Sequence, residues 1–290
     1  YNYLPYLTRK FRFVVLPYII VSLPAIINRL FLEPGTWEPD FLMDSSLFTK
    51  GAYLIATGKH LGPFWFIPMI VLFYIISPVF IAIDKPWFYK FIFPVLLIGT
   101  LFTYRFGYFS NSIDSAIHFL PVYIFGIFVS RYRTVFTEGK DWPVVVMLFL
   151  YLLLVFLEVT DILPIYRLNS AADAASDLFF GFNSPKLRMM LLCLILLKFF
   201  YKVQHINMPV LKLLGDYSFG LYFIHLYVII FLDTLYRKVI NPEPIYSIWL
   251  YIGMLVLTVA ISLSIIWITK KIFGKNIRMD CMARLQQLGG

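Results

Sequence analysis

The chain has 290 residues, of which 60% are hydrophobic and only 14% are charged, and its formal net charge is +9. A soluble globular domain carries about a quarter charged residues. The deficit here extends along the whole chain, which excludes a soluble domain of any size. No RNA- or DNA-binding motif accompanies the positive charge, so we expect no nucleic-acid partner.

Uniformly apolar runs of helical length dominate the sequence. A helix needs about 20 apolar residues to cross the ~30 Å hydrocarbon core of a bilayer, and these runs are too long and too evenly apolar for the strands of a barrel. They predict an all-α fold, a polytopic transmembrane helix bundle. We expect about eight spans, at residues 13–32, 62–83, 87–104, 113–130, 142–158, 187–203, 217–235 and 245–269.

The basic residues predict an orientation. Arg9, Lys10 and Arg12 directly precede the first apolar run. If this end is cytoplasmic and eight spans alternate, most Lys and Arg residues lie in cytoplasmic segments, as the positive-inside rule requires. Both ends of the chain are then cytoplasmic. We expect one transmembrane domain over residues 1–275, a cytoplasmic tail at 276–290, and outside loops at 33–61 and 159–186.

The expected span 217–235 carries a polar stripe, because Ser218, Tyr222, His225 and Asp233 fall on one face of a helix. Polar groups inside spans are costly and are therefore candidates for function. The imidazole of His225, near the middle of the span, can act as a base, an acid or a hydrogen-bond donor. The alternative is a histidine tied to a neighbouring helix by one hydrogen bond.

Three further residues have both a functional and a structural interpretation. Asp114 and His118 stand four apart on one helix face, where a carboxylate can orient an imidazole, but Asp114 can also simply favour a helix N-terminus. Trp65, at a membrane boundary, can belong to an interfacial aromatic belt or form a stacking surface for a sugar ring. No Cys and His cluster has zinc spacing, so no metal site is expected.

Four segments, taken in order, resemble the acyltransferase 3 family of bacterial integral membrane proteins. Arg9-Lys-Phe-Arg12, followed by Pro17-Tyr18, is similar to the family's R-x-x-R motif before its third span. Phe64-Trp65-Phe66 resembles the aromatic segment that opens the next span. Residues 119–128 resemble a Phe-rich, Gly-bearing span. Residues 214–225 follow the pattern Leu-Gly-x-x-Ser-Tyr-x-x-Tyr-x-x-His, with Phe219 where Tyr is commoner.

The resemblance implies that part of the fold lies before this chain. Family members typically have ten spans, and the first carries an R-x10-H motif whose His is regarded as catalytic. No Arg of this sequence stands at that spacing before a His. We therefore expect two further spans and the family's catalytic His upstream of Tyr1, which leaves His225, His118 and Asp114 as the catalytic candidates within the chain.

The resemblance also implies an activity. The family transfers an acyl group, commonly acetyl or succinyl, from cytosolic acyl-CoA to a carbohydrate on the outer side of the bacterial inner (plasma) membrane. Acyl-CoA is then a co-substrate, and no bound cofactor is expected. Arg9 and Arg12 are expected to bind the phosphates of CoA, whereas Trp65, Ser218 and Tyr222 are expected to line the cavity for the acceptor. The expected partners are acyl-CoA, a lipid-linked or surface polysaccharide, and membrane lipids.

Other interpretations remain open at this stage. Anionic lipids alone can account for the basic cluster. A polysaccharide exporter or a flippase-like transporter would need the same polar stripe and aromatic residues but no acyl-transfer chemistry, and an inactive, truncated remnant is a third possibility. Consumption of acyl-CoA separates an enzyme from a transporter.

Overall fold

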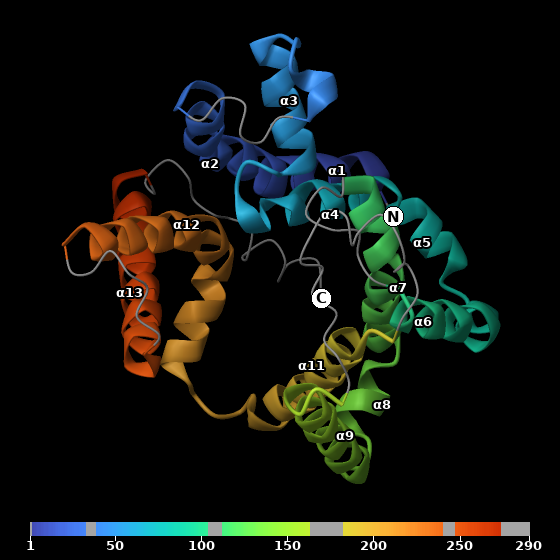
Figure 1. The fold of residues 1–290 in the computed structure, drawn as a ribbon. Coiled ribbons are helices and arrows are strands. Elements are labelled where there is room, and N and C mark those ends of the chain that lie inside the picture. The colour runs from blue at the N-terminus through green and yellow to red at the C-terminus, as the bar shows by residue number, and fades with distance from the viewer. Residues whose placement is uncertain (1, 33–38, 104–111, 163–181, 240–246, 274–290) are drawn as a thin grey trace. The chain divides into compact units, whose positions relative to one another are not determined.

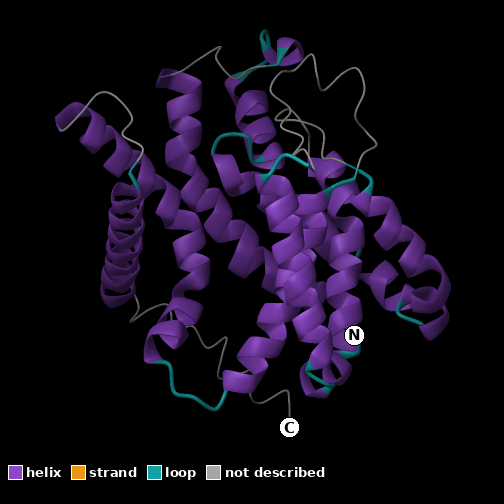
Figure 2. Cartoon of the chain, turned by 60° about the horizontal axis from the view of Figure 1, so that its bottom comes forward, coloured by secondary structure: helices purple, strands orange, loops and turns teal. Residues whose placement is uncertain are grey.

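The computed structural model describes residues 2–32, 39–103, 112–162, 182–239 and 247–273. Helices joined by turns and short loops make up this part of the chain, and it contains no β-strand (Figures 1 and 2). The predicted all-α fold is confirmed. The expected tail at 276–290 and most of the expected loop at 159–186 lie outside the described residues.

The chain divides into two compact units. The first, Tyr1–Ile206, contains the helices from α1 to α11, and the second, Asn207–Gly290, contains the long helices α12 (Pro209–Val239) and α13 (Ile248–Phe273). Within the second unit, α12 and α13 pack against each other (Figure 1). The expected single domain over residues 1–275 stays a prediction.

The N-terminal helix Tyr3–Leu32 is continuous over 30 residues. It consists, in order, of α1 (Tyr3–Lys10), a π-helical turn (Phe11–Val15), α2 (Leu16–Ile27) and a second π-helical turn (Asn28–Leu32). Pro17 follows the first π turn and explains it. Because Pro17 has no N–H, the carbonyl of Phe13 loses its usual helical partner, and the ladder directly ahead shifts so that the Leu16 N–H donates to the Phe11 carbonyl. The basic cluster therefore stands where the helical repeat changes.

A bent helix pair follows the N-terminal helix. Helix α3 (Leu47–Thr57) is separated by a short break from the segment Gly62–Ile75, which comprises a 3₁₀ turn (Gly62–Trp65) and α4 (Phe66–Ile75), and the two halves are bent by 81°. Sequence analysis assigned residues 33–61 to an outside loop, so α3 is a correction. It begins because the Ser46 hydroxyl accepts a hydrogen bond from the Thr49 N–H at 3.2 Å.

An aromatic core holds the middle of the first unit together. It joins α4 to α5 (Ser77–Ile83), to a π turn with α6 (Phe88–Ile92, Phe93–Leu101) and to α7 (Ser112–Arg131). Ring centroids lie 4.5 Å apart for Phe73 and Tyr123 and 5.0 Å apart for Phe93 and Phe128. Tilted aromatic pairs of this kind add about 0.5–1.5 kcal/mol each beyond the area they bury.

Two lysines of α11 (Ser184–Val203) each satisfy the end of a neighbouring helix. Lys186 donates to the Thr100 and Thr103 carbonyls of the α6 end, at 2.8 and 3.3 Å. Helix carbonyls at a C-terminus have no partner within their own helix, so a lysine ammonium with three donors stabilises such an end. The charge of Lys186 in an otherwise apolar helix therefore has a structural role.

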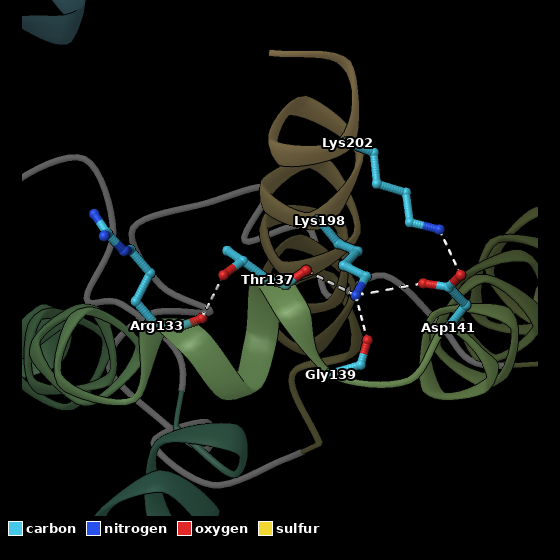
Figure 3. Close-up of polar contacts among 6 residues, drawn as sticks. All are labelled: Arg133, Thr137, Gly139, Asp141, Lys198 and Lys202. Atoms are coloured by element: carbon cyan, nitrogen blue, oxygen red, sulfur yellow. Dashed lines mark hydrogen bonds and ion pairs between the residues drawn. The ribbon is translucent and has the colours of Figure 1, made fainter. Parts of the chain in front are cut away.

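Lys198 plays the same part at the end of α8 (Arg133–Glu138), as Figure 3 shows. Its ammonium donates to the carbonyls of Thr137 at 2.8 Å and Gly139 at 2.5 Å, and it lies 3.3 Å from the carboxylate of Asp141. Asp141 directly precedes α9 (Trp142–Val159), which packs beside α11. Hydrogen bonds from Lys202 and Lys198 hold the pKa of Asp141 below its usual range.

A buried ion pair joins the other ends of α9 and α11. Glu158 is almost fully buried, and its carboxylate lies 3.1 Å from the guanidinium of Arg188 and accepts a hydrogen bond from the Ser184 hydroxyl at 2.8 Å. A buried carboxylate persists only when paired and hydrogen-bonded. Polar contacts at both ends therefore hold α9 and α11 together.

Among the described residues, five helices are long and apolar enough to cross a membrane, or six if the bent pair counts as one span. They are Tyr3–Leu32, Ser112–Arg131, Trp142–Val159, Pro209–Val239 and Ile248–Lys271. Each of the eight expected ranges contains helix. The number of eight spans and the cytoplasmic placement of both chain ends nevertheless stay predictions.

The bend between α3 and α4 yields a first prediction. Gly58 ends α3 in the left-handed region, with φ of 68°, and a Cβ there would stand 2.4 Å from the backbone nitrogen of Trp65. Gly58→Ala should therefore lower the free energy of unfolding by about 2 kcal/mol or more, from backbone strain and overlap. Gly62→Ala is the control, since its Cβ would meet nothing within 4 Å. Thermal unfolding in detergent measures both variants, and equal midpoints would contradict the account.

The α8 corner yields a second prediction, which compares two lysines that contact the same carboxylate. Lys198→Met should cost about 1–3 kcal/mol of folding free energy, because buried carbonyls lose their donor. Lys202→Met should cost less than about 1 kcal/mol, because that side chain is 52% exposed, against 5% for Lys198. Urea unfolding followed by tryptophan fluorescence distinguishes the two, and the account is wrong if the Lys202 variant is the weaker one.

Candidate functional site

A cavity of about 780 Å³ lies between α12 and α13 in the second unit. The helices approach closely at Gly220, where a Cβ would stand 2.9 Å from the side chain of Ile266. The cavity is mainly apolar, and its volume is within the range of small-molecule sites in proteins. Its polar lining residues are Tyr222, His225, Asp233, Thr234, Tyr236, Arg237, Tyr251 and Thr258.

Three members of the predicted polar stripe line this cavity, namely Tyr222, His225 and Asp233. His225 Nδ1 donates to the Leu221 carbonyl at 2.8 Å, which makes Nε2 the acceptor nitrogen of a neutral imidazole. Asp233 pairs with Arg237 on the next turn at 2.9 Å. Three of the four side chains that the 3.6-residue period places on one helix face therefore share a cavity.

Ser218, the fourth member of the stripe, does not line the cavity. Its side chain is exposed, and its hydroxyl donates to the Gly215 carbonyl one turn earlier, at 2.8 Å. Hydroxyls inside helices commonly bond back to the preceding turn. The expected role of Ser218 in binding the acceptor stays a prediction.

Arg9 and Arg12 stand exposed near the start of the N-terminal helix. No carboxylate in the described part of the chain forms an ion pair with either, and the Arg12 guanidinium lies 5.7 Å from the Phe13 ring. Lys10 instead lies over the Tyr74 ring at 4.8 Å and is partly buried. Two guanidinium groups are therefore available to an anion, whereas the lysine between them helps to fasten the helix.

Trp65 belongs to the aromatic core of the first unit. Its ring stacks on Phe119 with centroids 5.6 Å apart and 22° between planes. One face of the indole is thus occupied by another ring. The expected stacking of a sugar on Trp65 stays a prediction and would have to use the other face.

His118 lines a groove of about 590 Å³ between α7 and α11. Lys186, Asn183 and Cys193 contribute polar atoms to an otherwise apolar lining, and the His118 ring meets Phe119 edge to face at 4.8 Å. Asp114 is partly buried one turn earlier on α7 and is not among the lining residues. The structure thus gives His118 a cavity but does not bring Asp114 into it.

Sequence reasoning missed the end of α3 as a possible site. Three successive carbonyls there accept hydrogen bonds from side chains of three different segments. His60 Nδ1 donates to Leu54 at 3.0 Å, the Tyr18 hydroxyl donates to Ile55 at 2.7 Å, and the Ser112 hydroxyl donates to Ala56 at 2.7 Å. The break, the N-terminal helix and α7 therefore meet at this point.

The ring of His60 is enclosed by aromatic neighbours. Its centroid lies 5.8 Å from that of Tyr18 and 5.4 Å from that of Phe64, and only 2% of the residue is exposed. Sequence offered one signal for this arrangement, because Gly58, Gly62 and Pro63 bracket His60 with residues that interrupt helices.

Among the described residues, no group of three or more His, Cys, Asp or Glu side chains could hold a metal ion. The described part of the chain instead offers imidazoles, hydroxyls and unpaired guanidinium groups. These groups bind anions, hydrogen-bond to hydroxyl groups and move protons.

Comparison with known proteins identifies the family. The family model Acyl_transf_3, described as an acyltransferase domain, matches residues 1–267. No curated protein and no solved structure matches the chain at a significant level. The match covers most of the chain, including the basic cluster and both cavities. The chain therefore belongs to the acyltransferase 3 family and is a multi-pass membrane acyltransferase.

Proposed function

We propose that this protein transfers an acetyl or succinyl group from cytosolic acyl-CoA to a hydroxyl group of a carbohydrate outside the cytoplasm, and that it works in the bacterial inner membrane. The observation that carries the proposal is the pair of exposed guanidinium groups of Arg9 and Arg12, which no carboxylate in the described chain neutralises. Arginine binds phosphate oxygens in pairs and at short range. The phosphates of CoA are the matching anions.

The chemistry needs a donor site, an acceptor site and a base. In acyl transfer, a base takes the proton of the acceptor hydroxyl while its oxygen attacks the thioester carbonyl. The carbon–sulfur bond then breaks, and CoA leaves as a thiol after taking up a proton. A histidine is the expected base, and Arg9 and Arg12 would hold the leaving CoA.

The cavity between α12 and α13 supports the acceptor side of the proposal. Tyr222, His225 and Asp233 combine a ring face with hydrogen-bonding groups, which is the combination that a sugar ring with several hydroxyls requires. An exporter would need such a cavity as well, but it would neither bind nor consume acyl-CoA. Acyl-CoA chemistry therefore separates the proposal from transport without transfer.

A double substitution of the arginines tests the donor site. In Arg9→Ala/Arg12→Ala, we expect acyl transfer to fall by about 10²-fold or more, because hydrogen bonds to charged groups contribute about 1.5–3 kcal/mol each. Binding of acetyl-CoA to the purified protein should weaken in parallel. Release of CoA thiol and calorimetric titration with acetyl-CoA are the measurements.

Two further variants make the result specific. Arg9→Lys/Arg12→Lys keeps both charges but loses the paired geometry of guanidinium, so its rate should fall between those of the wild type and the alanine variant. Arg133→Ala removes an exposed arginine elsewhere in the first unit. It should change neither the rate of acyl transfer nor the affinity for acetyl-CoA. If the alanine variant binds acetyl-CoA like the wild type, the assignment of the donor site is wrong.

A further inference from the structure

His60 uses one ring nitrogen for structure and leaves the other without a partner. A carbonyl oxygen can only accept, so the contact between Nδ1 and the Leu54 carbonyl places the proton on Nδ1. Nε2 then carries a lone pair. It is buried, as is the residue as a whole, which is only 2% exposed, and it has no hydrogen-bond partner among the described residues.

A buried acceptor without a partner is costly, at about 1–3 kcal/mol, and native proteins keep few of them. The cap on Leu54 does not explain it, since a smaller side chain with one donor could make that bond. A second interaction, made by Nε2, is therefore needed to explain why this residue is a histidine. The partner that satisfies Nε2 must be a hydrogen-bond donor that the described chain does not supply.

Two buried hydroxyls on the neighbouring helices also lack a partner among the described residues. Ser22 and Ser115 are 0% and 1% exposed, and neither hydroxyl makes a hydrogen bond in that part of the chain. Ser22 lies one turn beyond Tyr18, on the same face of the N-terminal helix. Ser115 lies one turn beyond Ser112 on α7. Each serine therefore lies one helical turn after a residue that donates a hydrogen bond to the end of α3.

The chemistry of these groups selects a hydroxyl as the missing partner. Nε2 can only accept, whereas a serine hydroxyl can both donate and accept. A hydroxyl group also donates and accepts, so one hydroxyl can bond to Nε2 and to a serine together. An anion without a proton could not donate to Nε2, and a cation would find no carboxylate among these residues.

The position of the group along the N-terminal helix connects it to the arginines. Tyr18, whose ring contacts His60, stands six positions after Arg12, which is about 9 Å at 1.5 Å per residue. Ser22 lies about 6 Å farther along the same helix. A donor bound through its phosphates at the arginines and an acceptor bound at His60 would thus lie along the same N-terminal helix.

We propose that Nε2 of His60 accepts a hydrogen bond from a hydroxyl of the acceptor carbohydrate beside the one that attacks, with Ser22 and Ser115 completing the site. This role rests on the function proposed above. His60 is thus a positioning residue, and the attacking hydroxyl keeps its own proton for the base that activates it. The three residues form a hydroxyl-binding site at the end of α3, distinct from the cavity between α12 and α13.

Two amide variants separate the two nitrogens of His60. In His60→Asn, the amide nitrogen can replace Nδ1 and keep the bond to the Leu54 carbonyl, but nothing replaces Nε2. In His60→Gln, the longer side chain places an acceptor oxygen near the position of Nε2 and gives up the cap. If Nε2 binds a neighbouring hydroxyl of the acceptor, the glutamine variant should retain more transfer activity than the asparagine variant, despite being less stable.

The assay uses the natural full-length protein in membrane vesicles. The donor is acetyl-CoA or succinyl-CoA, and the acceptor is cell-envelope carbohydrate from a strain of the host that lacks the protein. For His60→Asn we expect an unfolding midpoint and an acetyl-CoA affinity like those of the wild type, with transfer reduced by about 10²-fold because the acceptor is no longer held in position. Transfer at the wild-type rate would overturn the proposal and leave His60 as a helix cap satisfied by an ordered water.

Serine variants keep the test decisive if the histidine variants do not fold. Ser22→Ala and Ser115→Ala remove hydroxyls that make no bond in the protein, so both should fold normally and raise the KM for the carbohydrate several-fold, with the affinity for acetyl-CoA unchanged. Ser112→Ala is the matched control. It loses the bond to the Ala56 carbonyl, so its unfolding midpoint should fall, unlike those of the other two serine variants. An unchanged KM in both serine variants would contradict the proposal.

The wild type distinguishes this inference from the proposed function. If the wild-type protein transfers neither acyl group to carbohydrate, the proposed function fails, and the role of His60 fails with it. If the wild type transfers and His60→Asn transfers equally well, only the role of His60 is overturned.

Discussion

The end of α3 imposes the strictest constraint on the first unit. A helix that stops inside an apolar protein leaves its last carbonyls without partners, and in lipid such groups must be satisfied by the protein itself. Here Tyr18 and Ser112 supply the donors for the Ile55 and Ala56 carbonyls, and His60 adds a donor to the Leu54 carbonyl, which also accepts the Gly58 N–H. Because the donors come from the N-terminal helix, the break and α7, satisfying one helix end also fixes the relative positions of three segments.

The same requirement recurs at the other helix ends of the first unit. Lys186 satisfies the end of α6, and Lys198 satisfies the end of α8. Each lysine reaches across from a neighbouring element, so that the chain does not bury these carbonyls without a donor. Among the buried polar residues that are described, His60, Ser112 and Lys198 make such contacts. Nε2 of His60 and the hydroxyls of Ser22 and Ser115 lack a partner among the described residues, as do single atoms of Glu158, Arg188 and Ser262.

The helical fold could be predicted from sequence because long apolar runs admit few other structures in a membrane. The 3.6-residue period also placed Tyr222, His225 and Asp233 on one cavity. Helix α3 escaped prediction because its 11 residues are too few to span a bilayer and its flanks are polar. Local pattern carries no information on which distant carbonyl a side chain reaches, so the partners of Tyr18, His60 and Lys198 could not be predicted. For the same reason, Trp65 gave no sign that Phe119 covers one of its faces.

One measurement tests the account most directly, namely an experimentally determined structure of the natural full-length protein with acetyl-CoA bound. The account predicts the phosphates of CoA within hydrogen-bond distance of Arg9 and Arg12, with the thioester extending along the N-terminal helix toward Tyr18 and His60. Binding of CoA at another basic site, such as the Lys198–Lys202 end of α11, with Arg9 and Arg12 bare, would contradict it.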